Sequence, residues 1–219
     1  ASEQSVIYPS DWSNWPWTAN GNKPTDSYYY WTPYNNRNFT KGHLLRSADR
    51  GGAESEMNIQ TFYPTNIAPE AYLYEEHWSK VEELLSDTWE CSDTTYVVTG
   101  CYYADNSYKT YDASNWGNQS ALSKECIIPT ARYKVILRTK SGSSGKSIAE
   151  CSSEEVMAIG FWFPQNLNNE NPNTTPPLSN YIYSVSEIEQ MIGGEFEFFP
   201  TVPTEVKNRV NINDWPGLN

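Results

Sequence analysis

The chain has 219 residues, of which 38% are hydrophobic and 15% are aromatic, and its formal net charge is −12. This hydrophobic content excludes a disordered chain and is sufficient for the core of one domain. The acidic charge disfavours a tight, non-catalytic nucleic-acid binder, because such proteins neutralise phosphates with Lys and Arg. An enzyme that turns its substrate over tolerates weak ground-state binding and stays compatible with this charge.

The N-terminal segment, residues 1–36, is rich in Trp, Tyr, Asn and Pro. Its prolines recur too often for a regular helix, so the sequence predicts an extended arm packed on the domain surface. A platform of aromatic rings that stacks on bases or sugars is the alternative interpretation. Residues 37–219 are predicted to form a single domain.

Two helices are expected after the arm. Residues 54–62 permit a short helix, and residues 70–88 predict a longer one. The apolar residues of the longer helix recur at spacings of three and four, the helical period: Tyr74, Trp78, Val81 and Leu85.

Three strands are predicted in the second half of the chain. Residues 94–100 are β-branched and end on a glycine, and residues 131–139 alternate like a half-buried strand. Residues 156–163 form a nearly continuous apolar run, which is typical of a central strand.

A last helix is predicted over residues 184–192. Ser184 and Glu187 have the spacing of a capping box, and Gly193 follows the end of the helix. The polar segments 102–125 and 164–180 are expected to be loops. Strands and helices that lack a βαβ rhythm predict an α+β fold with a central, mostly antiparallel sheet and flanking helices.

The cysteine content favours two disulfides over free buried thiols, because the number is even and no CxxC spacing points to zinc. If the three strands are antiparallel neighbours, the pairing Cys101–Cys126 and Cys91–Cys151 follows as a hypothesis. The chain shows neither an initiator Met nor a basic-then-apolar leader, so we expect a signal peptide that has been removed. No segment reaches the roughly 18 consecutive apolar residues of a membrane span. These features predict a secreted, periplasmic or cell-surface protein.

The candidate chemistry lies around His43. This histidine follows Gly42 and has basic neighbours at Lys41, Arg46 and Arg50. An imidazole accepts protons near neutral pH, and neighbouring cations keep it neutral and attract phosphate. A purely structural histidine is the alternative, since one such residue is weak evidence by itself.

The surrounding motifs make the pattern specific. They begin with Gly42-His43-Leu44, Ser47-Ala48-Asp49-Arg50, Asn58 to Tyr63, Thr65-Asn66 and Pro69. They continue through residues 96–100, 128–130, 133–135, 158–161, 187–189 and 198–200. From about residue 37 to 215 the chain thereby resembles the DNA/RNA nonspecific endonuclease family, whose ββα-metal (His-Me finger) site carries an Arg-Gly-His motif. The likeness is closest to its Bacteroidetes-type secreted branch.

The resemblance implies a sugar-nonspecific endonuclease that hydrolyses DNA and RNA phosphodiesters. His43 would be the general base, and a divalent ion, Mg²⁺ or Mn²⁺, would be the cofactor. Asn66 and Glu82 match positions that orient the water shell of the metal. The resemblance places basic side chains against phosphate: Arg50, Arg37, Lys41 and Arg46. Contacts to phosphate carry no base information, which explains a nonspecific enzyme.

Two positions depart from the family pattern. Lys41 replaces the arginine of Arg-Gly-His. The positive charge is kept, but the planar guanidinium group, which can bind two oxygens at once, is lost. The metal-carrying asparagine, four residues before Trp78, is Tyr74 here, and a phenol is a poor Mg²⁺ ligand.

Glu75 is the candidate substitute ligand for the metal, because it lies seven residues before Glu82 on nearly the same helical face. The alternative is that Glu75, Glu76, Glu82 and Glu83 form a solvated acidic face. Glu70, where the family often has Gln, is a further candidate for charge near a repositioned metal.

His77 is interpreted as a helix-surface residue, because no second imidazole is spaced to share a metal with it. A second functional class stays open for the whole chain. In that class the protein is a catalytically degenerate nuclease-fold domain that binds nucleic acid or glycan.

Overall fold

The computed structural model describes residues 39–50, 58, 60–62, 64–104, 109–110, 126–165, 176–194 and 196–218. The chain divides into two compact units. The first contains Ala1–Glu76, Tyr103–Thr130 and Gln165–Asn171, and the second contains His77–Tyr102, Ala131–Pro164 and Pro172–Asn219. The predicted arm, residues 1–36, lies outside the described residues. Among the described helices, none has the length and apolar character needed to cross a membrane.

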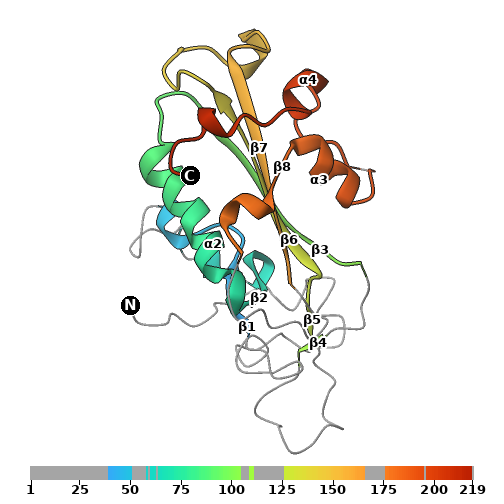
Figure 1. Cartoon of the computed structure of the whole chain (residues 1–219). Helices are drawn as coiled ribbons and strands as arrows, with labels where there is room; N and C mark the ends of the chain where they lie inside the picture. Colours follow the sequence, from blue (N-terminus) through green and yellow to red (C-terminus); the bar gives the residue numbers. More distant parts are fainter. Residues whose placement is uncertain are drawn as a thin grey trace, which may run out of the picture. The chain divides into compact units, whose positions relative to one another are not determined.

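The second unit is built on a four-stranded sheet, seen along β6 and β7 in Figure 1. Its order is β3-β6-β7-β8, and every neighbouring pair is antiparallel. The strands are β3 (Tyr96–Tyr102), β6 (Ala131–Thr139), β7 (Val156–Pro164) and β8 (Ile182–Tyr183). The α+β class and the three predicted strands are therefore confirmed, whereas β8 was not predicted.

One face of this sheet carries an apolar core beneath α3 (Val185–Met191) and α4 (Thr204–Lys207). Alternate residues of β6, Val135 and Leu137, point into this core. Gly160 lets α3 approach the sheet, because a Cβ there would lie 2.7 Å from Cγ1 of Ile188. Figure 1 shows α3 and α4 on the same side of β7.

The opposite face of the sheet buries three cations of β6, namely Arg132, Lys134 and Arg138. The expectation of a half-buried β6 was therefore wrong, because both faces of the strand are covered. Trp89 helps to cover this second face, since its ring stacks on Phe161 with centroids 6.4 Å apart.

The helical predictions are confirmed in part. The long helix begins later than expected: residues 67–71 form strand β2 (Ile67–Ala71), and α2 extends over Tyr72–Glu83 before a π-helical turn at Leu84–Thr88. The capping box of α3 is present, since Ser184 Oγ accepts from Glu187 N at 3.2 Å and Ser184 N donates to Glu187 Oε2 at 2.7 Å. Gly193 follows with φ at 103°.

The remaining elements are short. Strands β1 (Phe39–His43), β4 (Lys109–Thr110) and β5 (Cys126–Ile127) belong to the first unit. The 3-10 turns are Ser47–Arg50, Gln60–Phe62, Pro64–Asn66, Ile148–Glu150, Leu178–Tyr181 and Ile212–Asp214. Most of the short helix predicted at 54–62 lies outside the described chain, and its last three residues form a 3-10 turn.

The predicted disulfide Cys91–Cys151 is wrong. Cys91 Sγ lies 3.1 Å from the carbonyl oxygen of Asp93, and Cys151 Sγ lies 3.4 Å from that of Ser147, so both are thiols. No disulfide joins the cysteine side chains that the structure describes. Cys101 is a thiol as well, so the predicted pair Cys101–Cys126 is also wrong.

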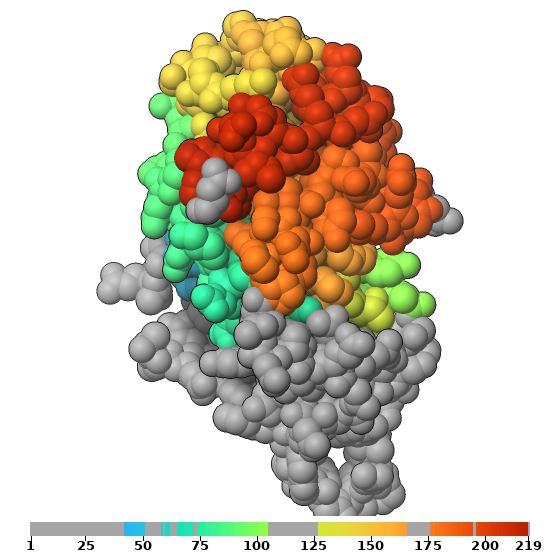
Figure 2. All heavy atoms as spheres, in the orientation of Figure 1, coloured from blue at the N-terminus to red at the C-terminus, as the bar shows by residue number. Residues whose placement is uncertain are grey.

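The C-terminal segment contacts the connection between β6 and β7 through hydrogen bonds and ion pairs. Arg209 Nη1 donates to Glu154 Oε1 at 2.9 Å, and its Nη2 donates to the carbonyl oxygen of Ser153. Lys140 Nζ lies 3.6 Å from Asp214 Oδ2. Figure 2 shows the two segments side by side on the surface, in red and yellow.

The same connection is held from its other side by Asp93. The Asp93 carboxylate accepts hydrogen bonds from the hydroxyls of Thr139 and Ser144, and from the backbone N–H groups of Ser144 and Gly145. These bonds, that from Thr139 above all, hold the pKa of Asp93 well below the usual range of an aspartate. A depressed carboxyl pKa stabilises the folded state above the unfolded pKa, and this contribution is lost as the pH falls.

We therefore predict that Asp93→Asn destabilises the protein most above about pH 4. The difference in urea midpoint between wild type and variant should shrink steadily as the pH is lowered from 5 to 2.5. A difference that stays constant over this range would contradict the assignment. Glu90→Gln, an exposed neighbour, is the control and should leave the midpoint unchanged.

Candidate active site

A two-stranded ribbon in the first unit positions His43. Strand β1 pairs antiparallel with β2, and the register places His43 opposite Ile67 and Gly42 opposite Ala68. All residues of β2 are buried, which anchors the ribbon. His43 is half-buried at the end of β1, and its Nε2 atom is buried. The imidazole is thus held at a fixed strand end.

The free edge of β2 is completed by the side chain of Gln165. Ala71 N donates to Gln165 Oε1 at 3.0 Å, and Gln165 Nε2 donates to the carbonyl oxygen of Pro69 at 2.8 Å. Gln165 is fully buried, so these bonds stabilise a strand whose proline cannot donate. The sequence does not point to Gln165, because nothing local distinguishes it from the polar loop that follows.

Asn66 fixes the chain directly after His43. Its Oδ1 accepts from Leu45 N at 3.0 Å, and its Nδ2 donates to the carbonyl oxygens of Leu45 and Thr61, each at 2.8 Å. Leu44 N also donates to the carbonyl oxygen of Asn66 at 2.8 Å. The amide of Asn66 is therefore engaged by backbone groups on both its oxygen and its nitrogen.

Asn58 braces the 3-10 turn Ser47–Arg50, which ends in the basic candidate Arg50 and directly follows another, Arg46. Asn58 Nδ2 donates to the carbonyl oxygen of Ser47 at 3.0 Å and to its hydroxyl at 2.7 Å. Within the turn region, Arg46 donates through Nε and Nη2 to Asp49 Oδ1 at 3.2 and 2.9 Å. Arg50 ends the turn and is exposed.

The other two basic candidates are only partly placed. Lys41 lies in β1 opposite Pro69, and its side chain lies outside the described residues. Arg37 lies outside them altogether. The first unit thus contains the backbone of His43, the brace of Asn66, and Arg46 followed by the turn that ends in Arg50.

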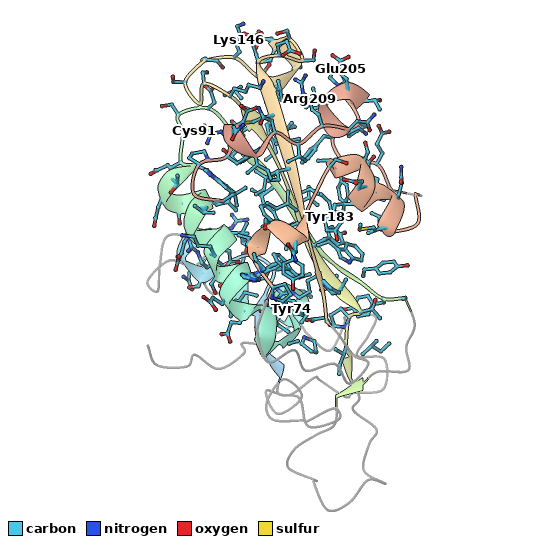
Figure 3. The ribbon with its side chains drawn as sticks, in the orientation of Figure 1. Tyr74, Cys91, Lys146, Tyr183, Glu205 and Arg209 are labelled. Atoms are coloured by element: carbon cyan, nitrogen blue, oxygen red, sulfur yellow. The ribbon has the colours of Figure 1, made fainter. Side chains whose placement is uncertain are left out.

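The acidic residues near the expected metal position differ in burial. Tyr74, labelled in Figure 3, is only 1% exposed, and Glu70 is buried in β2 opposite Thr40. Glu75 is half-buried, and no hydrogen bond or ion pair within the described chain engages its carboxylate. The described residues contain no group of three His, Cys, Asp or Glu side chains able to hold a metal. Of these side chains, Glu75 alone offers an accessible hard oxygen donor.

Glu82 belongs to the second unit and is buried there. Its Oε1 accepts from Lys134 Nζ at 3.3 Å. The alternative of a solvated acidic face is wrong for Glu82, while Glu76 and Glu83 are exposed as that alternative expects. The sequence does not point to Lys134, because its partner is 52 residues away.

His77, the second histidine, is not a simple surface residue. Its Nε2 lies 2.7 Å from the carbonyl oxygen of Pro176, and its ring centroid lies 5.5 Å from that of Tyr181. These contacts explain the conformation of His77 without a metal.

Comparisons with known proteins bear on the family of this chain. The family model described as DNA/RNA non-specific endonuclease matches residues 2–205, which includes the N-terminal segment set apart above. No curated protein matches this chain. A similar solved chain comes from a structure titled "Crystal structure of the EndoG/EndoGI complex: Mechanism of EndoG inhibition", with 18% identity and a TM-score of 0.46. The match covers 77% of this chain and 62% of that chain, less than two thirds of its length.

Proposed function

Because the chain belongs to the DNA/RNA non-specific endonuclease family, we propose that it hydrolyses phosphodiester bonds in DNA and RNA with His43 as the general base. The neutral imidazole accepts a proton from water, the resulting hydroxide attacks phosphorus, and the 3′-oxygen leaves with the bonding electrons. A proton returned to that oxygen completes the hydrolysis.

The anchoring of His43 is the observation that carries this proposal. A general base must hold its nitrogen within hydrogen-bond reach of the attacking water, and small displacements cost rate. The pairing of His43 with Ile67 and the clamp of Asn66 on Leu45 supply that rigidity. In this proposal Asn66 is a positioning residue, which acts through the backbone that follows the base.

Basic side chains are proposed to hold the phosphate. Arg50 is exposed at the end of its turn. Arg46, which pairs with Asp49, reaches phosphate after release from that carboxylate. Lys41 and Arg37 are assigned to the same role on the sequence alone. Because all four would contact phosphate oxygens, cleavage is expected to be independent of base sequence.

Family membership implies a divalent metal ion. In this chain the candidate ligand for that ion is Glu75. We propose that its half-buried carboxylate replaces the missing asparagine and holds Mg²⁺ or Mn²⁺, with water completing the shell. A bound ion stabilises the negative charge that develops on the phosphate. Tyr74, being buried, contributes packing in place of ligation.

The burial of Tyr74 also favours a second candidate function. If Glu75 does not hold an ion, the chain is a nuclease-fold domain that binds nucleic acid or glycan without cleaving it. Degradation of plasmid DNA and of RNA, each measured with Mg²⁺, with Mn²⁺ and with EDTA, separates the two candidates. Cleavage that EDTA abolishes supports the enzyme, and intact substrates at every ion concentration contradict it.

We predict that Glu75→Ala raises the Mg²⁺ concentration needed for half-maximal cleavage about tenfold or more. A lost carboxylate ligand lowers the affinity for a hard cation. The measurement is an initial-rate titration with Mg²⁺. Glu76→Ala, an exposed neighbour on the same helix, is the matched control and should leave the titration unchanged. Identical titrations for wild type and Glu75→Ala would exclude Glu75 as the ligand.

Export from the cell, as in the secreted branch of the family, is proposed from the sequence alone. The thiol state of Cys91, Cys101 and Cys151 removes both of the disulfides on which that expectation rested. Fractionation of the native host, with the protein detected by antibody, tests it. Recovery of the chain only from the cytoplasm would contradict export.

A further inference from the structure

Strand β3 forms one edge of the four-stranded sheet in the second unit. It pairs with β6 on one side, and no other strand that the structure describes pairs with it on the other. In an antiparallel pair, alternate residues point their N–H and C=O groups away from the partner strand. The outer side of β3 therefore presents a row of backbone donors and acceptors to which a further strand can bind.

The two edges of this sheet differ in how they are protected against further pairing. Strand β8, at the other edge, contains only Ile182 and Tyr183 and is too short to guide a long partner strand. Strand β3 contains seven residues. Residues 94–104, which include it, contain neither a charged side chain nor a proline. Short strands, edge charges and prolines are the usual devices that keep a sheet edge unpaired, and β3 carries none of these three.

The side chains at the start of β3 add an exposed apolar surface to this edge. Tyr96 and Val97 are each 42% exposed. Because adjacent residues of a strand point to opposite faces of the sheet, both faces are open at this end of β3. Their partners on β6, Leu137 and Ile136, are buried. The exposed apolar surface thus belongs to the edge strand, where a further strand would cover it.

We propose that residues 96–100 of β3 pair with the same residues of a second copy of the chain, which joins two four-stranded sheets into one. Identical edges pair around a two-fold axis, and the two β3 strands then run antiparallel in a self-complementary contact. Charge favours this occupant. With 27 acidic and 15 basic residues, two copies repel each other over most of their surfaces, and an uncharged strand lets them meet with little repulsion. A basic partner would need carboxylates at its contact, and residues 94–104 have none.

This contact concerns the assembly of the chain and goes beyond the proposed function, because neither His43 nor Glu75 takes part in it. An uncharged contact between two acidic copies has a characteristic dependence on salt. Salt screens the repulsion between the copies and leaves the backbone hydrogen bonds between the strands largely unchanged. The dimer should therefore become tighter as the NaCl concentration is raised, whereas a contact held by ion pairs would become weaker.

Sedimentation equilibrium of the full chain tests the proposal. Wild type should pass from the mass of one chain to twice that mass with a Kd of about 1–100 µM, because one pair of strands is a small interface. Val97→Glu places a negative charge on each of the facing edges and should raise Kd at least about tenfold. Val97→Gln has the same shape without the charge and should keep Kd within about threefold of wild type. Ile212→Glu, at another exposed apolar position of the second unit, is the matched control and should leave Kd unchanged.

Hydrogen exchange shows whether backbone pairing forms the contact. The outward-pointing amides among residues 96–100 should exchange slowly at protein concentrations above Kd and faster on dilution. In Val97→Glu they should exchange fast at both concentrations. Circular dichroism should show that this variant is folded, as expected for a substitution at an exposed side chain. If it does not fold, the dilution series of wild type decides.

Three results would overturn pairing between copies through β3. The first is a wild type that stays monomeric up to about 0.5 mM, well above the Kd expected for a small interface. The second is a dimer that Val97→Glu leaves intact, which would place the contact elsewhere on the chain. The third is slow exchange of the outward amides in a monomer, which would mean that another segment covers the edge. None of these measurements uses nucleic acid, so the proposed nuclease activity and the β3 contact can fail separately.

Discussion

Replacing His43 with alanine is expected to lower kcat for DNA and RNA cleavage by about 10²–10⁴-fold, the usual contribution of a general base. The loss should be the same for both substrates, because proton abstraction from water does not involve the sugar. KM should change little, since the imidazole is assigned to water and not to phosphate. Initial rates on plasmid and on RNA at saturating Mg²⁺ measure the effect.

The second histidine provides the control for this experiment. His77→Gln keeps a hydrogen-bonding group near the carbonyl oxygen of Pro176 and should retain the rate of wild type. Circular dichroism and Tm should show that His43→Ala is folded. A rate for His43→Ala within about threefold of wild type would show that His43 is not the general base.

Asn66→Ala is expected to combine a large loss of stability with a loss of rate. It removes three hydrogen bonds and leaves backbone groups of Leu45 and Thr61 without their partner. At about 1 kcal/mol for each bond, the sum is about 3 kcal/mol, or a fall in Tm of about 6–12 °C for a chain of this size. The loop after His43 then loses its position, and kcat should fall about tenfold to a hundredfold.

Asn66→Asp refines the same prediction. The carboxylate keeps an acceptor for Leu45 N, but it cannot donate to the carbonyl oxygens of Leu45 and Thr61 and should repel them. We expect it to be at least as damaging as alanine. Asn180→Ala, at an exposed position, is the control. An Asn66→Ala variant with the Tm and kcat of wild type would show that the clamp does not position the base.

The strands of the main sheet could be predicted because their residues carry the pattern locally. The β-branched residues of β3, the apolar run of β7 and the alternation of β6 are each local signals of strand structure. The burial of Arg132 and Lys134 could not be predicted in this way. It depends on Trp78 and Glu82, which lie more than 50 residues earlier in the chain.

The ribbon that positions His43 escaped prediction for a related reason. Residues 67–71 contain Pro69, which weakens a strand assignment and suits the first turn of a helix equally well. The strand exists because Gln165, 96 residues from Pro69, supplies the missing edge. The disulfide prediction failed at Cys91–Cys151 because an even number of cysteines constrains pairing only if all of them are oxidised.

The three buried cations of β6 constrain the register of this strand against β3 and β7. In the native register Arg132, Lys134 and Arg138 share one face, and Val135 and Leu137 share the other. A slip of one residue against β3 or β7 would turn the cations into the apolar core beneath α3. Each charge would then be buried without a partner, at a cost of several kcal/mol. The three cations thus disfavour misaligned strands, because any such alignment buries unpaired charge in the apolar core.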